Sequence, residues 1–542
     1  MIMTVKSLAI IGTGIMGMGI AQIAAQAGIQ VLLFDAKAGA AEQGRQSLQA
    51  MLEKLAAKGK FTDEQLQSTL SNLTVIEDIA KIADVDVVIE AIIENLDIKK
   101  QLFKQLESLV PAETILATNT SSLAVTAIAS DCEHPERVAG FHFFNPVPLM
   151  KIVEVIPGIS TKPSVVETLT TLAKRMGHLG VVAKDTPGFI VNHGGRAYGT
   201  EALKILGEGI AGFEDIDRIL REGAGFRMGP FELLDLTGID VSHPVMESIY
   251  NQYYSEPRYR PHPLTRQMLT GNKLGRKVGE GFYQYKNGQK VTADTSEQSS
   301  FEASVSKDRF SQKGADADTS NLSVWIGADL AEDKQQLTDH LNANGITIDD
   351  NDQPNSDSLI LLAIYGEDTT NAAIRYQVNP KQAVAIDMLT DLSKHRTLMP
   401  SIVTEDNFVA QAYALFGRNN KLGKSSDEDS EVAVDATLIA ESTGFVAQRV
   451  VAMVINLGCD IAMQGIATPK DIDNAVKLGL GYPYGPISWG DELGAERILL
   501  ILERIYGLTG DPRYRPSPWL QRHAKLGISL FTQQTNLINP IF

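Results

Sequence analysis

Cysteine is almost absent from this chain. Only Cys132 and Cys459 occur among its 542 residues. Two cysteines so far apart give no basis for a disulfide framework or a thiolate metal cluster, so we expect no disulfide-stabilised fold and no metal site. Their scarcity fits a reducing compartment, and we expect the protein in the cytoplasm.

Positive charge and long apolar runs are scarce as well. The chain has 49 Lys and Arg against 66 Asp and Glu, which gives a formal net charge of −17. Nucleic acid is therefore not an expected partner, and an anionic substrate would need a local basic patch. We expect no membrane span, because no apolar run reaches the length that one needs. We also expect no signal peptide, because the N-terminus runs straight into a predicted strand.

The length of the chain predicts several domains. At roughly 150 residues per domain, 542 residues correspond to three or four domains. Hydrophobic residues make up 44% of the chain and charged residues 21%, which is ordinary for a globular protein. Composition alone therefore does not indicate the function, which has to be inferred from local motifs.

A glycine-rich loop near the N-terminus has the context of a dinucleotide-binding fold. The apolar run 7–11 predicts a buried strand, and the loop Gly12-Thr-Gly-Ile-Met-Gly17 follows at once. A predicted helix and a second predicted strand, 29–34, come next. In this context Gly12 allows the tight turn, Gly14 lets the backbone approach a pyrophosphate, and Gly17 lets the helix pack closely on the strand.

The residues around this loop indicate which cofactor it binds. Ile15 and Met16 lie at the start of the helix, whose free N–H groups and positive dipole end favour phosphates. Asp35 ends the second strand, 18 residues after Gly17, where a carboxylate can accept hydrogen bonds from both ribose hydroxyls. That carboxylate would repel a 2′-phosphate. We therefore predict NAD, rather than NADP, as the cofactor.

Polar residues follow two further predicted strands of this unit. Residues 86–91 predict a strand that is followed by Glu94 and Lys99, and residues 115–118 predict one that is followed by Asn119-Thr-Ser-Ser122. Strand ends face the cofactor crevice in doubly wound sheets, so Glu94 and Lys99 are plausible cofactor neighbours. The hydroxyls at 120–122 are either helix caps or substrate ligands.

A basic segment lies between the predicted strands 29–34 and 86–91 of this acidic chain. Residues 42–67 predict a pair of helices, and their basic residues include Arg45, Lys54, Lys58 and Lys60. The cluster could hold an anionic tail of a substrate. Solvated helix faces carry such charges routinely, so both interpretations stay open.

A histidine and a glutamate lie on two adjacent predicted strands. His142 lies near the end of an apolar run, the prolines at 146 and 148 break that strand, and β-branched residues resume it around Glu154. Adjacent strands can bring the two side chains into hydrogen-bonding reach. A carboxylate on one imidazole nitrogen fixes the tautomer and raises the basicity of the other nitrogen. The pair is either a general base with its orienting acid or a buried structural pair.

Residues beyond 184 predict an all-helical unit that extends to about Tyr285. Residues 184–188 predict a turn, residues 189–207 predict a long helix, and Gly229-Pro230 breaks the chain again. Taken together, residues 1 to about 286 resemble the L-3-hydroxyacyl-CoA dehydrogenase family. The segments that carry the resemblance are Gly12–Gly17, Glu94–Leu96, Asn119–Ser122, His142–Pro148, Thr186–Asn192 and Gly279–Tyr283.

The resemblance implies roles for individual residues. His142 would be the general base that takes the 3-hydroxyl proton as hydride leaves C3 for the nicotinamide, and Glu154 would orient and stabilise it. The residues that would hold the substrate's hydroxyl or thioester carbonyl, or lie beside it, are Ser121, Asn192 and Asn145. The residues that match coenzyme A contacts are Ser47 and Lys54, and those that match cofactor contacts are Asp35, Glu94, Lys99, Ser121 and Lys277.

The back half of the chain repeats the helical unit. Four segments recur 256 residues later: Gly188–Asn192 as Gly444–Gln448, Asp215–Asp217 as Asp471–Asp473, Gly229-Pro230 as Gly485-Pro486, and Asp235 as Asp491. Arg258-Tyr-Arg-Pro261 recurs as Arg513-Tyr-Arg-Pro516. We therefore predict two helical domains that pack pseudo-symmetrically within the chain. Gln448 replaces Asn192 and would displace a substrate contact, so we predict a structural role for the second copy.

Two segments separate the copies. Residues 287–321 are rich in Ser, Asp, Lys and Gln and predict a flexible linker. Apolar runs at 324–326, 359–364 and 383–387 predict strands of a small α/β domain without a glycine motif, so we predict no second cofactor. This domain resembles the reduced Rossmann-like domain of the long bacterial members of the family.

The predicted fold class is α/β, with a Rossmann-type NAD-binding domain, two all-helical domains related by duplication and a reduced Rossmann-like domain. The predicted boundaries are 1–186 for the NAD-binding domain, 187–286 for the first helical copy, 287–321 for the linker, 322–430 for the reduced domain and 431–542 for the second copy. Duplication could replace a dimer or build a larger one, so a homodimer stays open.

The predicted function is NAD-dependent oxidation of an L-3-hydroxyacyl-CoA to the 3-oxoacyl-CoA. The long bacterial members that the chain resembles include the 3-hydroxybutyryl-CoA and 3-hydroxyadipyl-CoA dehydrogenases of phenylacetate degradation, so the acyl group is a short monoacid or a diacid. A diacid would need a cation at the far end of the pocket, for which His193 and Arg196 are candidates. A solvated or interface face suits these two residues at least as well. The alternatives are a dehydrogenase of a free hydroxy acid and a non-catalytic NAD-binding protein.

Overall fold

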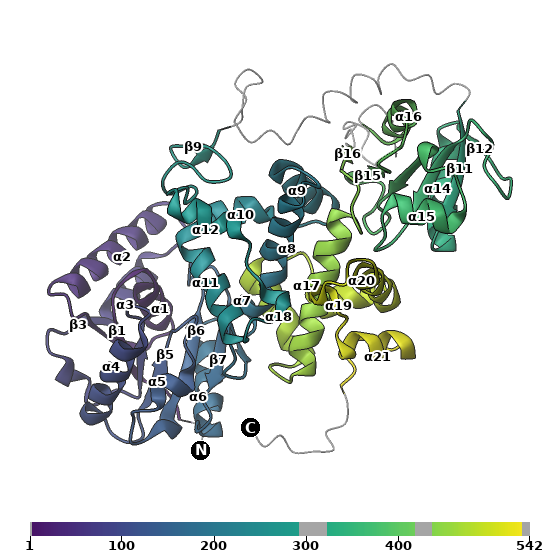
Figure 1. The fold of residues 1–542 in the computed structure, drawn as a ribbon. Helices are drawn as coiled ribbons and strands as arrows, with labels where there is room; N and C mark the ends of the chain where they lie inside the picture. The colour runs from purple at the N-terminus through teal and green to yellow at the C-terminus, as the bar shows by residue number, and fades with distance from the viewer. Residues whose placement is uncertain (1–2, 292–321, 418–435, 534–542) are drawn as a thin grey trace. The chain divides into compact units, whose positions relative to one another are not determined.

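The chain folds into two compact units, whose helices and strands are labelled in Figure 1. The computed structural model describes residues 3–291, 322–417 and 436–533. Of these described residues, the first unit takes 3–194, 461–487 and 533, and the second takes 195–291, 322–417, 436–460 and 488–532. These bounds differ from the predicted boundary at 186, because the short helix that carries Asn192 packs with the first unit. The second helical copy is divided between the two units.

An eight-stranded sheet forms the centre of the first unit. Its strand order is β3-β2-β1-β4-β5-β6-β7-β8. The strands are β1 Ser7–Ile11, β2 Gln30–Phe34, β3 Leu73–Val75, β4 Val87–Glu90, β5 Ile115–Thr118, β6 Val138–Phe143, β7 Ile152–Pro157 and β8 Leu179–Val182. Strands β1 to β6 are parallel, β7 runs antiparallel to β6, and β8 is parallel to β7. This order confirms the predicted Rossmann-type sheet.

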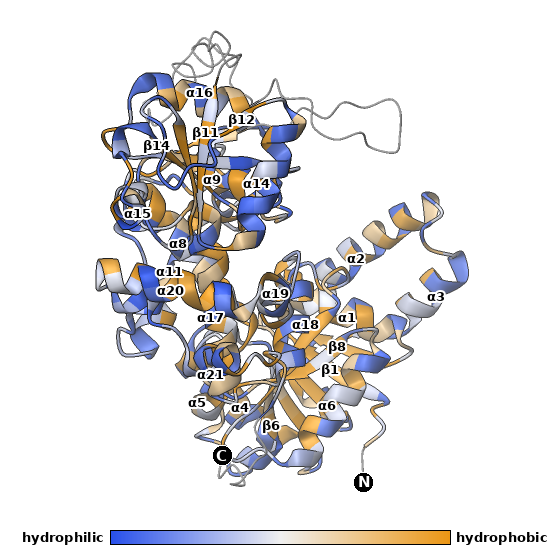
Figure 2. Ribbon diagram, turned by 90° about the vertical axis from the view of Figure 1, so that its right-hand side faces the viewer, coloured by the Kyte–Doolittle hydropathy of each residue, from blue (hydrophilic) through white to orange (hydrophobic). Residues whose placement is uncertain are grey.

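Helices cover both faces of this sheet, so its central strands are buried and almost wholly apolar. Every residue of β4 and β5 is buried. Figure 2 shows the strands of this sheet, among them β1 and β6, mostly in the apolar colour, and the helices around them in mixed colours. The helices of the first unit are α1 Ile15–Gln26, α2 Ala40–Ala57, α3 Asp63–Ser71, α4 Leu96–Leu109, α5 Val125–Ala129, α6 Pro163–Arg175, α7 Val191–Gly194 and α18 Pro469–Leu480.

The predicted helical pair over residues 42–67 corresponds to α2 and α3. The chain turns between them at Gly59, whose φ is +68°. Helix α3 then begins with a capping box, in which Thr62 and Gln65 each accept a hydrogen bond from the other's backbone N–H. Local turn and cap signals therefore set these bounds.

The helices of the second unit come from both copies. Those of the first copy are α8 Arg196–Gly207, α9 Phe213–Arg218, α10 Pro230–Thr237, α11 Ile239–Gln252 and α12 Pro263–Thr270. Those of the second copy are α17 Val446–Met463, α19 Pro486–Leu493, α20 Ala495–Thr509 and α21 Pro518–Leu526, of which α17 and α19 each extend into residues of the first unit. The single long helix that we predicted over residues 189–207 is wrong. It is split into α7 and α8 at Gly194-Gly195, a pair with low helix propensity.

A short hairpin follows the first helical copy. Strands β9 Tyr285–Lys286 and β10 Gln289–Lys290 pair antiparallel across Asn287 and Gly288, which both have positive φ. An Asn-Gly turn of this kind matches the twist of a hairpin. The hairpin takes the first residues of the segment predicted as a linker, and the rest of that segment, from 292 to 321, lies outside the described residues.

A six-stranded sheet lies in the second unit. Its order is β12-β11-β13-β14-β15-β16, and only the β14–β15 pair is antiparallel. Its elements are β11 Ser323–Ala328, α14 Ala331–Ala343, β12 Thr347–Ile348, β13 Leu359–Ala363, α15 Thr369–Tyr376, β14 Ala383–Ile386, β15 Arg396–Pro400, α16 Asp406–Phe416 and β16 Ala436–Leu438. An antiparallel pair followed by a parallel one repeats the pattern of β6, β7 and β8. The sheet is thus a shortened version of the first, as predicted.

The two helical copies touch through their repeated arginine motifs. Arg258 of the first copy donates to the carbonyl of Arg515 at 2.6 Å, and Arg513 of the second donates to the carbonyl of Arg260 at 3.4 Å. Because Arg258 corresponds to Arg513 and Arg260 to Arg515, the contacts are reciprocal. Reciprocal contacts are what a pseudo-two-fold arrangement requires.

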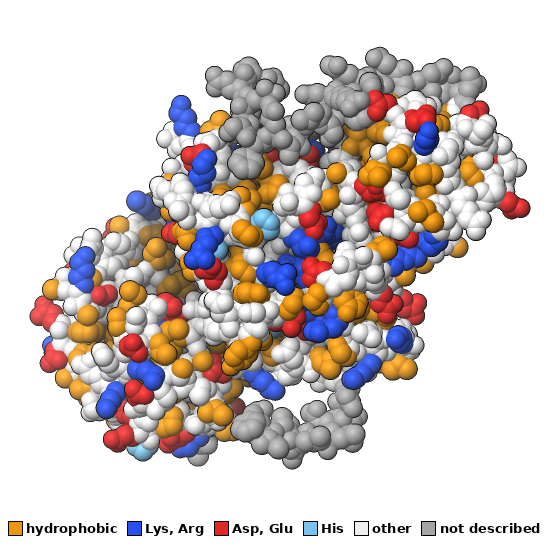
Figure 3. Space-filling view, viewed as in Figure 1, with side chains coloured by type: hydrophobic (Ala, Val, Ile, Leu, Met, Phe, Trp, Pro, Cys, Tyr) orange, Lys and Arg blue, Asp and Glu red, His pale blue; other side chains and the backbone are white. Residues whose placement is uncertain are grey.

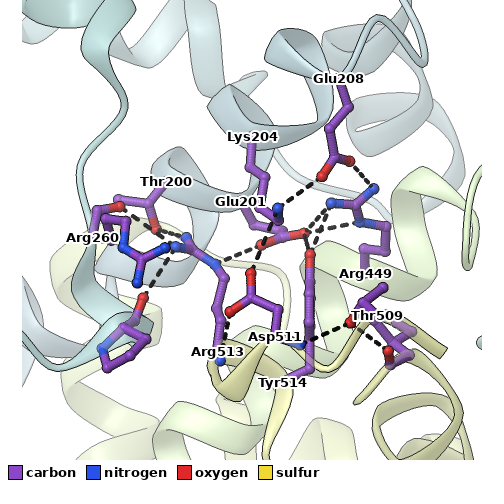
Figure 4. Close-up of polar contacts among 12 residues, drawn as sticks. Thr200, Glu201, Lys204, Glu208, Arg260, Arg449, Thr509, Asp511, Arg513 and Tyr514 are labelled. Carbon is purple, nitrogen blue, oxygen red and sulfur yellow. Dashed lines mark hydrogen bonds and ion pairs between the residues drawn. The ribbon is translucent and has the colours of Figure 1, made fainter. Parts of the chain in front are cut away.

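A buried carboxylate strengthens this contact (Figure 4). Glu201 of the first copy has no exposed surface and accepts from Arg449 Nε at 2.9 Å and from Arg513 Nε at 2.8 Å. The Tyr514 hydroxyl donates to it at 2.6 Å. Burial alone would raise the pKa of Glu201, but the two guanidinium groups outweigh it and lower that pKa.

Helix α17 corrects one expectation from the sequence. It has 18 residues and is apolar enough to cross a membrane by length and composition, contrary to our reading of the apolar runs. Within the structure, 89% of this stretch is buried, as in a core helix.

The face of the molecule drawn in Figure 3 interleaves acidic, basic and apolar side chains.

Candidate active site

The three glycines of the N-terminal loop differ in what surrounds them. A Cβ on Gly12 would lie 2.6 Å from the Ala91 carbonyl oxygen, and one on Gly17 would lie 1.8 Å from the Gly12 oxygen. A Cβ on Gly14 would meet nothing within 4 Å. The outer glycines are therefore required by packing, whereas Gly14 borders open space at the start of α1. A pyrophosphate fits there, next to the N–H groups of the first helical turn.

Asp35 lies at the end of β2, as predicted, and also holds the glycine loop. Its Oδ2 accepts from Thr13 N at 2.8 Å and from Thr13 Oγ1 at 2.9 Å, and its Oδ1 accepts from Lys37 N at 3.0 Å. Burial raises the pKa of Asp35, but these hydrogen bonds outweigh burial and lower it. The ionised Oδ1 keeps acceptor capacity for a ribose hydroxyl. Ile15 at the helix start is 79% exposed, which leaves an apolar surface beside the loop.

Glu94 organises the loop that follows β5. Its Oε1 accepts from Thr120 Oγ1 at 2.7 Å, from Ser121 N at 2.9 Å and from Ser122 N at 3.0 Å. Lys99 lies behind it, 1% exposed, at 2.5 Å from Glu90 and 3.4 Å from Glu94. Burial would raise the pKa of Glu94, but Lys99 and the hydrogen bonds lower it. Lys99 therefore acts on this loop through Glu94 rather than from the open crevice.

His142 and Glu154 face each other across β6 and β7. The two residues are paired in the strand register, and His142 Nδ1 lies 2.7 Å from Glu154 Oε2. Glu154 is fully buried, and its Oε1 accepts from Ile190 N at 2.8 Å and from Val191 N at 2.9 Å. Because an ionised carboxylate only accepts, a hydrogen bond of Nδ1 to such a carboxylate requires the proton on Nδ1, and a neutral imidazole with that tautomer presents a lone pair on Nε2. Nε2 has no hydrogen-bond partner among the described residues.

Two of the other predicted substrate residues, Ser121 and Asn192, are connected to this pair through α7. Asn192 directly follows Val191 on α7, and its Nδ2 lies 3.5 Å from the carbonyl oxygen of Ser121. Asn145 is exposed in the turn after β6. The structure thus brings together three separate segments, around residues 121, 142 and 192.

Some features of the site escaped sequence reasoning. The ring of Phe144 lies 4.5 Å from that of His142 and the ring of Phe189 lies 5.8 Å from it, so both flank the imidazole. Phe189 has a φ of +48°, which is unusual for a residue with a side chain. Adjacency in the sequence could have indicated Phe144. Nothing in the side-chain pattern marks the backbone amides of Ile190 and Val191 as ligands of Glu154.

The remaining predicted residues lie farther out or in the second unit. Ser47 and Lys54 are exposed on α2, on the same face as Met51 and Lys58. Lys277 belongs to the second unit, where it forms an ion pair with Asp240. Of the two candidate cations, His193 is fully buried and Arg196 begins α8 in the second unit.

The second sheet holds an altered version of the same site. Ile386 pairs with Leu398 as Phe141 pairs with Val155, and Leu398 O accepts from Ile439 N as Val155 O accepts from Ala183 N. The residues that correspond to His142, Glu154 and Asn192 are therefore Asp387, Thr397 and Gln448. Gln448 Nε2 donates to Asp387 Oδ1 at 3.0 Å. Burial raises the pKa of Asp387 to about 6. This trio does not contain a histidine–carboxylate pair.

The fold and the site are those of an NAD-dependent dehydrogenase. The 3-hydroxyacyl-CoA dehydrogenase NAD-binding domain matches residues 7–186, and the C-terminal domain of the same enzymes matches both 188–285 and 444–530. The chain belongs to the 3-hydroxyacyl-CoA dehydrogenase family. The double match also confirms the duplicated helical domain.

Relatives match over the whole chain and over its front half. The 3-hydroxyadipyl-CoA dehydrogenase of Escherichia coli K12 is 37% identical over 526 residues, which is 97% of this chain and 99% of that protein. The human mitochondrial hydroxyacyl-coenzyme A dehydrogenase is 42% identical over 288 residues, 52% of this chain and 92% of that protein. The crystal structure of 3-hydroxybutyryl-CoA dehydrogenase from Escherichia coli K12 has a TM-score of 0.79 and 36% identity, and covers 97% of this chain and 99% of its own. The protein is thus an oxidoreductase that oxidises 3-hydroxyacyl-CoA with NAD.

Proposed function

We propose that His142 is the general base of this oxidation and that Glu154 orients it. His142 Nε2 takes the proton of the substrate's 3-hydroxyl group while the C3–H bond breaks and its electron pair leaves as hydride, so that C3 becomes a ketone. Bound NAD supplies the hydride acceptor. The observation that carries this proposal is the 2.7 Å contact between His142 Nδ1 and a fully buried Glu154. A buried carboxylate stabilises the imidazolium that forms.

We further propose that Ser121 and Asn192 hold the reacting oxygen or the thioester carbonyl, with Asn145 beside them. Glu94 supports this arrangement because it fixes the amide of Ser121 at 2.9 Å. The Asn192 amide group lies 3.5 Å from the same segment, so substrate and base would meet between β5, β6 and α7. Positioning of this kind lowers the entropic part of a barrier.

We assign the other ligand contacts on the same basis. The glycine loop and Asp35 are proposed to hold NAD, with Glu94 and Lys99 shaping the adjacent wall. Ser47 and Lys54 are proposed to meet coenzyme A, because their shared exposed face on α2 also presents Met51 and Lys58. A cationic and apolar stripe suits the phosphates and the adenine ring. Lys277 remains a proposed cofactor contact.

We infer that the acyl group is short, with 3-hydroxybutyryl-CoA and 3-hydroxyadipyl-CoA as the two candidates. Two relatives that match along 97% of the chain carry these names. We therefore propose a role in fatty-acid or phenylacetate catabolism, in the cytoplasm, where the two free cysteines would stay reduced. Light scattering on the full chain distinguishes a monomer from a homodimer.

The test is NADH formation by the purified protein with a panel of 3-hydroxyacyl-CoAs. His142→Gln should lower kcat by roughly 10²- to 10⁴-fold, because the base is lost, and should leave NAD binding intact. His134→Gln, at an exposed histidine, is the matched control and should keep full activity. A His142→Gln variant within tenfold of wild type would overturn the assignment. The ratio of kcat/KM for the two acyl groups decides between monoacid and diacid.

A further inference from the structure

A helix of the second copy packs against the catalytic elements. Helix α18 lies in the first unit, where it contacts α7, β7 and β8. The segment that precedes α18 is fixed by a backbone hydrogen bond of 2.9 Å, which Lys184 N donates to the carbonyl of Ile466. Helix α7 carries Asn192 and β7 carries Glu154. The second helical copy therefore packs against the elements that hold Glu154 and Asn192, although its own half of the chain has no histidine–carboxylate pair at the corresponding positions.

The contact between α18 and α7 depends on a glycine from each helix. A Cβ on Gly479 would lie 2.8 Å from Val191 Cγ2 and 3.1 Å from Val191 Cγ1. A Cβ on Gly194 would lie 3.2 Å from Val476 Cγ2. Each glycine thus receives a valine of the other helix, and both valines are buried.

The backbone conformation of Gly479 does not itself require glycine. Its φ is not in the positive range, unlike that of Gly481 two residues later, which has a φ of +67°. Glycine within a helix costs about 1 kcal/mol relative to alanine. The close approach of Val191 is therefore the physical reason for glycine at this position.

Val191 connects this contact to the catalytic pair. Its backbone N–H holds Glu154 Oε1 at 2.9 Å, beside the N–H of Ile190 at 2.8 Å. A β-branched side chain in a helix has one strongly preferred χ1, so pressure on Val191 Cγ2 is relieved by moving the backbone. A shift of that backbone displaces the amides, and with them Glu154 and the ring of His142.

We propose that Gly479 is a positioning residue for the oxidation at His142. By receiving Val191 it fixes the two amides that hold Glu154, and through Glu154 it fixes the imidazole. The proposal rests on the proposed roles of His142 and Glu154. It assigns the second helical copy a share in catalysis that does not require catalytic residues of its own.

The test is Gly479→Ala in the full chain, with Gly507→Ala as the matched control. Gly507 lies on α20 of the same copy, where a Cβ would meet nothing within 4 Å. We expect Gly479→Ala to lower kcat by roughly ten- to a hundredfold, since misplacement by about 1 Å has such effects. The KM for NAD should stay unchanged and the acidic limb of the pH–kcat profile should move. Gly507→Ala should match the wild type in all three.

A compensating change separates positioning from general damage. Gly479→Ala combined with Val191→Ala removes the two methyl groups that the new Cβ meets, and should recover most of the lost kcat. If Gly479→Ala does not fold, Val191→Ala alone should lower kcat and move the same pH limb, because the space beside Gly479 is then empty, whereas the alanine Cβ fills it in the double variant. Wild-type kcat and pH profile in a folded Gly479→Ala or Val191→Ala would overturn the proposal, as would no recovery in the double variant. An active His142→Gln would instead overturn the assignment of the base.

Discussion

The substitution Glu154→Gln tests the hydrogen-bond geometry around the proposed base. Glu154 Oε1 accepts from two backbone amides, and Oε2 faces His142 Nδ1 at 2.7 Å. A glutamine has only one side-chain oxygen. If that oxygen meets the two amides, its NH₂ group faces Nδ1, which must then accept a hydrogen bond. The ring proton moves to Nε2, the nitrogen that is proposed to take the substrate's proton.

The competing orientation of the glutamine is strongly disfavoured. It would turn the NH₂ group toward two buried N–H groups and leave both without an acceptor, at about 1–3 kcal/mol each. The wrong tautomer should therefore prevail by roughly 2–6 kcal/mol. A comparable reversal of tautomer in serine-protease triads lowers kcat about 10⁴-fold. We expect a loss of similar size, about 5 kcal/mol of barrier, for Glu154→Gln.

The assay is single-turnover NADH formation, combined with an NAD titration and a thermal melt. NAD affinity should remain, because Glu154 lies outside the glycine loop. Glu167→Gln, at an exposed glutamate of α6, supplies the matched control and should behave as wild type. A single-turnover rate constant within tenfold of wild type in a folded Glu154→Gln variant would refute the tautomer argument.

Two further predictions concern buried carboxylates of the second unit. Glu201→Gln removes the charge between Arg449 and Arg513 and should lower the free energy of unfolding by about 3–5 kcal/mol in a urea titration. Glu208→Gln, at the partly exposed edge of the same cluster, should lower the free energy of unfolding by less than about 1 kcal/mol. Because the pKa of Glu201 is lowered in the folded protein, this stabilisation is present above pH about 4.5 and should fade as the pH falls further. The contribution of Asp387 to the free energy of unfolding has the opposite pH dependence. Because burial raises its pKa to about 6, its ionisation lowers the free energy of unfolding as the pH rises from about 4 through 6. Asp387→Asn should raise the free energy of unfolding by up to about 3 kcal/mol at pH 8 and by nothing at pH 4, and an equal effect at both would contradict the assignment.

Local patterns were sufficient for the first sheet and for the pairing of His142 with Glu154. The strand, glycine loop and helix around Gly14 are contiguous, so the sequence alone predicts them. His142 and Glu154 are separated by one short turn, which leaves little freedom in the pairing of their strands. The Asn287-Gly288 turn could also have been read from the sequence, because this dipeptide is a strong hairpin signal.

Features that depend on long-range packing were not predictable. Lys99 reads as a cofactor neighbour, but only the fold reveals that Glu90 and Glu94 surround it. Backbone amides such as those of Ile190 and Val191 leave no signature in the side-chain sequence. Helix α18 joins the first unit although it is more than 250 residues from α7, and no periodicity indicates such a contact.

The reciprocal arginine motifs have a consequence for how the two copies can change. In a dimer of identical subunits every substitution is made twice, so both faces of the contact must tolerate it. Here one arginine, Arg513, meets Glu201, whereas its counterpart Arg258 meets Asp460, which does not correspond to Glu201 in the repeat. Covalent linkage lets each side acquire its own partner. It also lets one copy of the site lose the histidine–carboxylate pair while the other keeps it, and dilution cannot separate the two copies.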